Sequence, residues 1–250
     1  MKFVKRIVLG ALVIAPMFGF AEDGESASGV TWEKNVSMGA SFKEGNTEQS
    51  LYTLDLKVNR LSAEFDLLSS LYAEYGRTGT STSDKERTEG QVRGQSEYRR
   101  TIKDSKFFAG VFGEIVNDSI TKVWFRGKMG PNIGYYLMDT DNMKLDASFG
   151  INYVYERTAT SEGDFGEYRA ALNYLWDFTE TASYYLNVEY SANVEKVNTD
   201  NNGFLVTGVR TKINETLSFF GELREEYDNL PDAGIKHTDL TVIAGLSYDF

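Results

Sequence analysis

The 250-residue sequence has no cysteine, one histidine, three prolines and no long apolar run. Without cysteine the chain cannot form a disulfide scaffold, a thiolate zinc site, a cysteine nucleophile or a lipid-modified cysteine. A single histidine excludes a multi-histidine metal centre. No stretch approaches the roughly 18 consecutive apolar residues of a membrane helix, so no helix is expected to cross a bilayer.

Basic residues are also scarce relative to acidic ones. The chain carries 26 Lys and Arg against 37 Asp and Glu, which gives a net charge of −11. Recognition of nucleic acid requires a basic face that neutralises phosphates, so no nucleic-acid partner is expected. The aromatic share of 14% is too high for a disordered chain. The 16 Phe and 15 Tyr, set against three Pro, favour strands.

The first 21 residues have the pattern of a secretory signal peptide. Three basic residues precede an apolar run at 7–15, and Gly19-Phe20-Ala21 supplies the small residues of a cleavage site. Cleavage is expected before Glu22, which leaves 26 − 3 = 23 basic residues and a mature charge of −14. The alternative is an uncleaved anchor, but its apolar run is too short for about 30 Å of hydrocarbon.

Beyond residue 30, apolar and polar residues alternate at every second position. Strict alternation predicts strands with one apolar and one polar face. In one segment the apolar parity is Leu145, Ala147, Phe149, Ile151, Tyr153 and Tyr155. Many segments exceed the roughly 9–11 residues of a membrane-crossing strand. Twelve segments are predicted, near 32–42, 47–59, 63–76, 87–102, 106–116, 123–138, 143–157, 165–178, 181–195, 203–213, 217–227 and 238–250.

Short and longer connections alternate between these segments, as they do in outer-membrane barrels. The sequence therefore predicts an all-β, antiparallel, up-and-down transmembrane barrel of about 12 strands over 32–250. The signal peptide and a short periplasmic segment at 22–31 precede it, and both ends of the barrel face the periplasm. Aromatic residues near the predicted periplasmic strand ends suggest a lipid-interface girdle: Trp32, Phe107, Tyr135, Trp176, Phe178, Tyr184, Tyr248 and Phe250.

Two further expectations concern the sheet itself. In a β-sandwich the apolar parity would pack on a second sheet, and alternation alone fits that fold equally well. Strand length, loop alternation and the aromatic girdle favour the barrel. Pro131 falls in mid-strand and removes one ladder hydrogen bond, so we expect a β-bulge there.

The polar parity carries many charges of both signs. On the lipid face an Arg or Lys near the midplane would cost about 2–4 kcal/mol, so this parity is assigned to the lumen. Two interpretations stay open: a polar lumen that passes small hydrophilic solutes, and a lumen closed by Arg–Glu pairs. The candidate lumen-lining residues are Arg93, Glu97, Arg99, Glu114, Arg126, Lys128, Arg169 and Glu189.

Catalytic chemistry has little support in the sequence. His237, followed by Thr238 and Asp239, is the one candidate for a general base in an outer-membrane hydrolase. Such a histidine is more often a solvated loop residue, so no enzyme activity is expected, and no catalytic, cofactor or metal site is assigned. A second alternative is a binding module that uses long surface loops such as 77–86.

The order of several short motifs resembles a known family. Trp32 is followed by Met-Gly-Ala-Ser-Phe at 38–42 and Gly-Asn-Thr at 45–47, then by Arg-Gly-Gln-Ser-Glu-Tyr-Arg at 93–99 and a terminal Phe250. This order resembles the YdiY-like bacterial outer-membrane proteins, some of which are described as salt-induced. The resemblance implies a barrel in the outer membrane of a Gram-negative cell. It supplies no activity, substrate, cofactor or catalytic residue.

These observations together lead to one functional expectation. The mature protein would be a narrow, weakly selective pore, or an envelope-maintenance barrel linked to osmotic or salt stress. Its expected partners are outer-membrane lipid, lipopolysaccharide and the barrel-assembly machinery. The terminal strand resembles the signal read by that machinery, with Tyr248 and Phe250 as its aromatic residues.

Overall fold

The computed structural model describes residues 29–43, 48–79, 86–119, 122–231 and 237–250. Those residues form strands and no helix long and apolar enough to cross a bilayer. The expected signal peptide at 1–21 and most of segment 22–31 lie outside the described residues. The strands are β1 (Val30–Lys43), β2 (Glu48–Ser62), β3 (Asp66–Gly79), β4 (Glu86–Glu89), β5 (Gln91–Thr101), β6 (Phe107–Asp118), β7 (Val123–Asp139), β8 (Met143–Thr158), β9 (Glu162–Asp177), β10 (Ala182–Asn193), β11 (Asn201–Lys212), β12 (Leu217–Asp228) and β13 (Thr238–Asp249).

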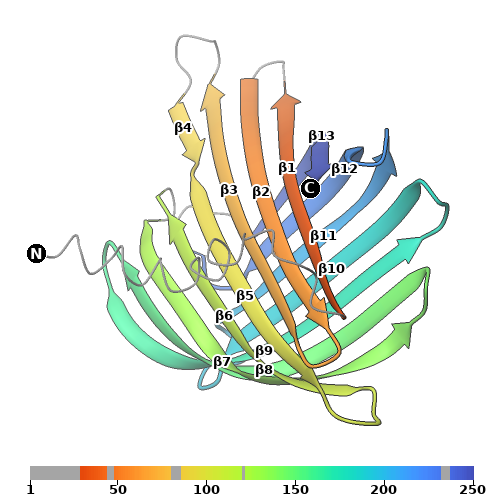
Figure 1. The fold of residues 1–250 in the computed structure, drawn as a ribbon. Coiled ribbons are helices and arrows are strands. Elements are labelled where there is room, and N and C mark those ends of the chain that lie inside the picture. The colour runs from red at the N-terminus through yellow and green to blue at the C-terminus, as the bar shows by residue number, and fades with distance from the viewer. Residues whose placement is uncertain (1–28, 44–47, 80–85, 120–121, 232–236) are drawn as a thin grey trace, which may run out of the picture.

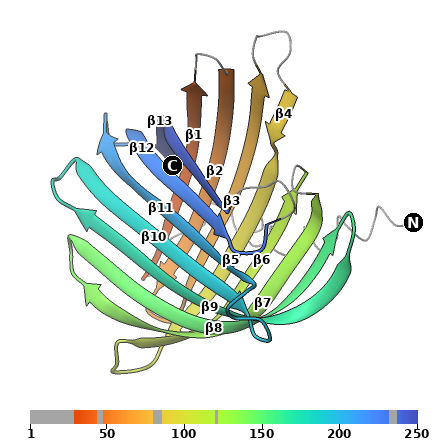
Figure 2. The same cartoon turned by 180° about the vertical axis from the view of Figure 1, so that it is seen from behind.

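The strands form one closed antiparallel sheet. Except for β4 and β5, strands that are neighbours in sequence pair with each other, and β1 pairs with β13 to close the ring (Figures 1 and 2). β4 and β5 both pair with β3 and occupy one position in the ring, so the barrel has the predicted 12 strands. The up-and-down barrel is therefore confirmed, and the sandwich is wrong.

The boundary between β4 and β5 differs from the prediction of one strand over 87–102. The pairing shifts by one residue between Gly76↔Glu89 and Arg77↔Arg87, and Gly90 lies just beyond this bulge. The predicted loop 158–164 is also shorter, because β9 begins at Glu162. Loop lengths therefore alternate less strongly than the sequence suggested.

The bulge expected at Pro131 is absent. Met129 pairs with Tyr153 and Asn132 with Gly150, so the β7–β8 register is the same on both sides of the proline. Extended backbone suits the fixed φ of proline, and the missing N–H only leaves one carbonyl without its ladder donor. The register of β7 shifts instead between Val123 and Phe125 and between Tyr136 and Met138.

Burial in this sheet is the reverse of that in a water-soluble protein. On β8 the polar Ser148 and Asn152 are buried, whereas Phe149, Ile151 and Tyr153 are at least half exposed. An apolar outside and a polar inside are the arrangement of barrels that sit in lipid. The aromatic residues of the girdle also contact one another on the outside, as in Phe107–Tyr135 with ring centroids 4.8 Å apart.

The ring closes along a short seam. The ladder between β1 and β13 joins Asn35–Ala40 to Ala244–Asp249, which is six residue pairs, whereas the β1–β2 ladder has fourteen. At the end of the seam where β1 begins, the backbone N–H of Phe250 donates to the carbonyl of Lys34 at 3.1 Å. The last residue of the chain therefore lies beside the first strand.

Candidate functional site

Lys128 on β7 is the centre of an ion-pair cluster inside the barrel. Its ammonium lies 3.0 Å from Glu189, 3.3 Å from Glu114 and 3.4 Å from Glu167. Its side chain is only 5% exposed. Because a charge in such a site needs close partners, the three carboxylates from β6, β9 and β10 are what allow a lysine here.

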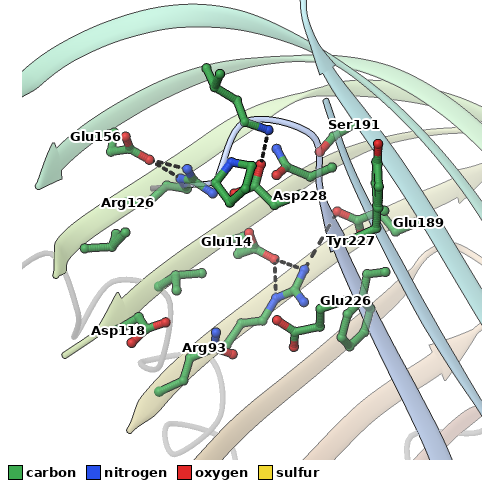
Figure 3. Close-up of a pocket in the computed structure, with 18 of the residues that line it drawn as sticks. Arg93, Glu114, Asp118, Arg126, Glu156, Glu189, Ser191, Glu226, Tyr227 and Asp228 are labelled. Carbon is green, nitrogen blue, oxygen red and sulfur yellow. Dashed lines mark hydrogen bonds and ion pairs between the residues drawn. The ribbon is translucent and has the colours of Figure 1, made fainter. Parts of the chain in front are cut away.

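Arg93 on β5 extends this cluster across the lumen (Figure 3). Its Nε donates to Glu114 at 2.6 Å, and its Nη2 lies 3.8 Å from Glu189 on the far wall. The guanidinium also lies over the ring of Phe204 on β11, 4.7 Å from the centroid. Arg93 thus connects opposite walls of the barrel.

Arg169 on β9 completes the cluster from the other side. Its Nη2 donates to Glu189 at 2.8 Å, and its guanidinium lies 3.8 Å from the ring centroid of Phe112. Arg93, Lys128 and Arg169 are therefore balanced by Glu114, Glu167 and Glu189. We call these six residues the central cluster.

The other predicted lumen residues form two separate pairs. Arg99 pairs with Glu97 at 3.1 Å and with Asp146 at 3.2 Å, on the side of the central cluster where β1 begins and β13 ends. Arg126 pairs with Glu156 on the opposite side, close to the loops. The structure thus places five of the eight predicted residues in one cluster and the remaining three in two smaller groups.

Sequence reasoning missed several residues of this interior. Phe112 and Phe204 face inward and contact arginines, although neither was among the predicted lumen residues. Arg224 forms a further group on the wall near the seam. Its Nη2 lies 2.7 Å from the carboxylate of Glu222, and its guanidinium lies 4.0 Å from the ring centroid of Tyr72. Glu222 and Arg224 also lie on the charged, polar parity of their segment, but a pattern of period two cannot say which inward residues meet.

Three adjoining cavities run through the barrel. The cavity near the longer loops, here called the outer cavity, measures about 320 Å³, and the middle one measures about 210 Å³. The third, which we call the periplasmic cavity after the orientation predicted from the sequence, measures about 800 Å³. Arg93, Glu189 and Phe204 line both the outer and the middle cavity, and Lys57, Asn173 and Asn187 line both the middle and the periplasmic one. The central cluster therefore lies where the outer and middle cavities meet.

The charge of these cavities changes along the barrel axis. Eight carboxylates and three basic groups line the outer cavity, whereas the middle cavity has four of each. Among the described residues, Glu226, Asp228 and Asp239 at this end have no basic group within 4.0 Å. Within the described chain, no three acidic or histidine side chains are grouped closely enough to hold a metal ion.

His237 lies at the rim of the outer cavity. Its Nδ1 is 2.9 Å from the backbone oxygen of Asp228, and its ring stacks on Tyr227 with centroids 6.4 Å apart. Among the described residues no serine or threonine hydroxyl is hydrogen bonded to this imidazole. The contact with Asp228 uses the main chain rather than the carboxylate, so it is not the acid–histidine pair of a catalytic triad.

Fold and lining together define the class: an outer-membrane β-barrel of the porin-like type, with a polar, ion-paired interior. Within that class, the chain belongs to the family described as "Protein of unknown function, DUF481", which it matches over residues 36–250. The uncharacterised family implied by the sequence resemblance is thus confirmed. The YdiY-like name and the salt label remain predictions.

Two solved structures share this architecture at low sequence identity. The NanC porin has a TM-score of 0.52 and 8% identity, and the match covers 86% of this chain and 100% of the porin chain. The COG4313 outer membrane channel from Pseudomonas putida F1 has a TM-score of 0.51 and 9% identity, and the match covers 92% of this chain and 100% of the channel chain. At these identities the likeness is one of fold alone. No curated protein matches the sequence.

Proposed function

We propose that the protein is a narrow pore for small hydrophilic solutes in the outer membrane of a Gram-negative cell, where it contacts lipid and lipopolysaccharide. The observation that carries this proposal is the run of three adjoining cavities, each with charged and amide side chains in its lining, through a barrel with an apolar outside. The central cluster narrows the passage where the outer and middle cavities meet. Pairing across the lumen accounts for the small size of the pore, since paired side chains occupy space that water would otherwise fill.

Removal of the Arg93 side chain should widen the pore. We expect wild-type protein in planar bilayers to give small, stable conductance steps, and Arg93→Ala to raise the single-channel conductance several-fold. Arg157→Ala is the matched control, because Arg157 is 43% exposed, pairs with Glu162 near the loops and lies over the outward-facing Trp124. A silent wild-type protein that leaks only after Arg93 is replaced would identify a plug and overturn the pore.

The excess of carboxylates around the outer cavity should make the pore prefer cations. Charged linings concentrate counter-ions and repel ions of their own sign. In a potassium chloride gradient, the reversal potential should therefore indicate greater permeability to potassium than to chloride. Neutralising Asp228 and Asp239 together should reduce the preference, and a reversal potential that favours chloride in the wild type would contradict this expectation.

Phe250 is proposed to serve the barrel-assembly machinery. Its ring is 60% exposed on the outside, stacks on Tyr248 with centroids 6.2 Å apart and lies under the ammonium of Lys34. Deletion of Phe250 should lower the yield of folded protein in the outer membrane, measured by heat-modifiable migration. Deleting it should leave refolding of the purified chain in detergent nearly unchanged. Normal yield in cells would contradict the role.

The link to osmotic or salt stress rests on the resemblance to YdiY-like proteins. A deletion strain that grows as well as its parent at high salt would argue against it. The hydrolase alternative predicts that His237→Ala abolishes a lipase or protease activity of the purified protein. The binding-module alternative predicts that trimming 77–86 removes a ligand while conductance persists.

A further inference from the structure

The basic residues of the periplasmic cavity differ from those of the other cavities. Four basic residues line this cavity: Lys34 on β1, whose ammonium lies over the ring of Phe250, and three others, Lys57 on β2, Lys144 on β8 and Arg210 on β11. In the described parts of the chain, none of these three other side chains has a carboxylate within 4.0 Å or makes a hydrogen bond. By contrast, all three basic residues of the outer cavity are ion paired.

The carboxylates of the same cavity already have donors. Asp146 pairs with Arg99 at 3.2 Å and accepts from Asn173 at 2.9 Å. Asp249 accepts from Asn35 at 2.6 Å, and Glu33 accepts from Asn59 at 3.2 Å. Every side-chain carboxylate of this cavity therefore has at least one donor, although Glu33 and Asp249 keep their charge because their donors are neutral amides, whereas Lys57, Lys144 and Arg210 have no partner among the described residues.

Arg210 shows this imbalance most clearly. Its Nε is buried without a hydrogen-bond partner. The Nε atoms of Arg99, Arg169 and Arg224 share that condition, but each of those arginines is ion paired through the same guanidinium. Arg210 alone of this group has no ion pair, and a buried donor of this kind requires a partner.

The three cations also surround the cavity rather than line one wall. In ring order β2, β8 and β11 are well separated. The three strands β1, β13 and β12 lie between β2 and β11, the two strands β9 and β10 lie between β8 and β11, and four strands lie between β2 and β8 along the shorter path. Lys57 and Arg210 lie at the inner end, since Lys57 also lines the middle cavity and both line a small pocket with Asp55, Tyr185 and Glu222. The Oδ1 of Asp55 is buried there without a hydrogen-bond partner, but it lies more than 4.0 Å from both cations. The amide of Asn187 lies there too.

We infer that the periplasmic cavity is a binding site for a small organic anion with two or three carboxylate or phosphate groups. Its volume of about 800 Å³ matches a small-molecule site, typically about 300–1,000 Å³. Charge-assisted hydrogen bonds from Lys57 and Arg210 hold the anion, and Lys144 contacts a second anionic group from the opposite wall. The acidic outer cavity repels anions, so the ligand enters from the periplasm.

The test measures binding directly and does not depend on conduction. Purified barrel in a zwitterionic detergent is titrated with citrate by calorimetry, and separately with glucose as an uncharged solute. We expect saturable binding of citrate, none of glucose, and an affinity that falls as sodium chloride is raised. The double variant Lys57→Gln/Arg210→Gln should weaken citrate binding at least tenfold, and Lys144→Gln alone should weaken it severalfold.

The control is Lys122→Gln/Lys196→Gln, which removes the same charge from the loops at the opposite end of the barrel. It should bind citrate as the wild type does. Equal weakening in both double variants would mean a general charge effect and would overturn the site, as would the absence of citrate binding by wild-type protein. Heat-modifiable migration of every variant establishes that the barrel is folded before titration.

Discussion

Gly130→Val is expected to prevent the barrel from folding. A Cβ at position 130 would fall on the carbonyl oxygen of Ile151 and lie 2.7 Å from the Cα of Asn152 on β8. Backbone atoms of a neighbouring strand cannot move aside without breaking the ladder. The cost should therefore reach or exceed the upper end of about 1–3 kcal/mol seen for overpacked cores. Heat-modifiable migration and resistance to trypsin measure the folded fraction.

Gly221→Val is the matched control for this substitution. A Cβ at Gly221 on β12 meets no atom within 4 Å. The same change in side chain should therefore leave the folded fraction near that of wild type. If Gly130→Val folded as well as Gly221→Val, the close approach of β7 and β8 described here would be wrong.

Lys128→Met should destabilise the barrel by about 3–5 kcal/mol, since removing one partner of a buried ion pair leaves the others uncompensated. Here the loss leaves Glu114, Glu167 and Glu189 with only Arg93 and Arg169 to balance three charges. Urea unfolding followed by tryptophan fluorescence measures the change in the free energy of unfolding.

Two further variants give this prediction its controls. Arg157→Gln breaks the exposed pair with Glu162, and exposed pairs contribute at most about 1 kcal/mol. Adding Glu167→Gln to Lys128→Met removes one of the unbalanced carboxylates and should recover part of the lost stability. A Lys128→Met barrel as stable as Arg157→Gln would show that the central cluster contributes little to the fold.

The alternation of residue types was sufficient to predict the barrel and its number of strands. A one-residue error in parity would put charges such as Lys128 and Glu189 into lipid, so the energetic penalty makes the assignment of faces robust. Local departures from regular strand pairing were harder to predict. The break at Gly90 depends on a one-residue shift against β3, and the unshifted strand at Pro131 depends on how closely β8 approaches.

The interior was only partly predictable. Sequence alternation placed Arg93 and Glu189 on the same side of the sheet, but their meeting depends on the curvature that brings β5 and β10 to face each other across the ring. For the same reason nothing in the sequence separates Lys128, which has three carboxylate partners, from Lys57, which has none. Inward aromatic residues such as Phe204 were missed because strands favour aromatic residues on either face.

The short ladder between β1 and β13 has a mechanical consequence. Under a pulling force the ring should part along this line first, because six residue pairs resist separation less than the eleven or more of most other strand pairs. Parting there would convert the cylinder into a curled sheet with two free edges. Such edges pair readily with other strands, so the line of closure is also where an unzipped chain would begin to aggregate.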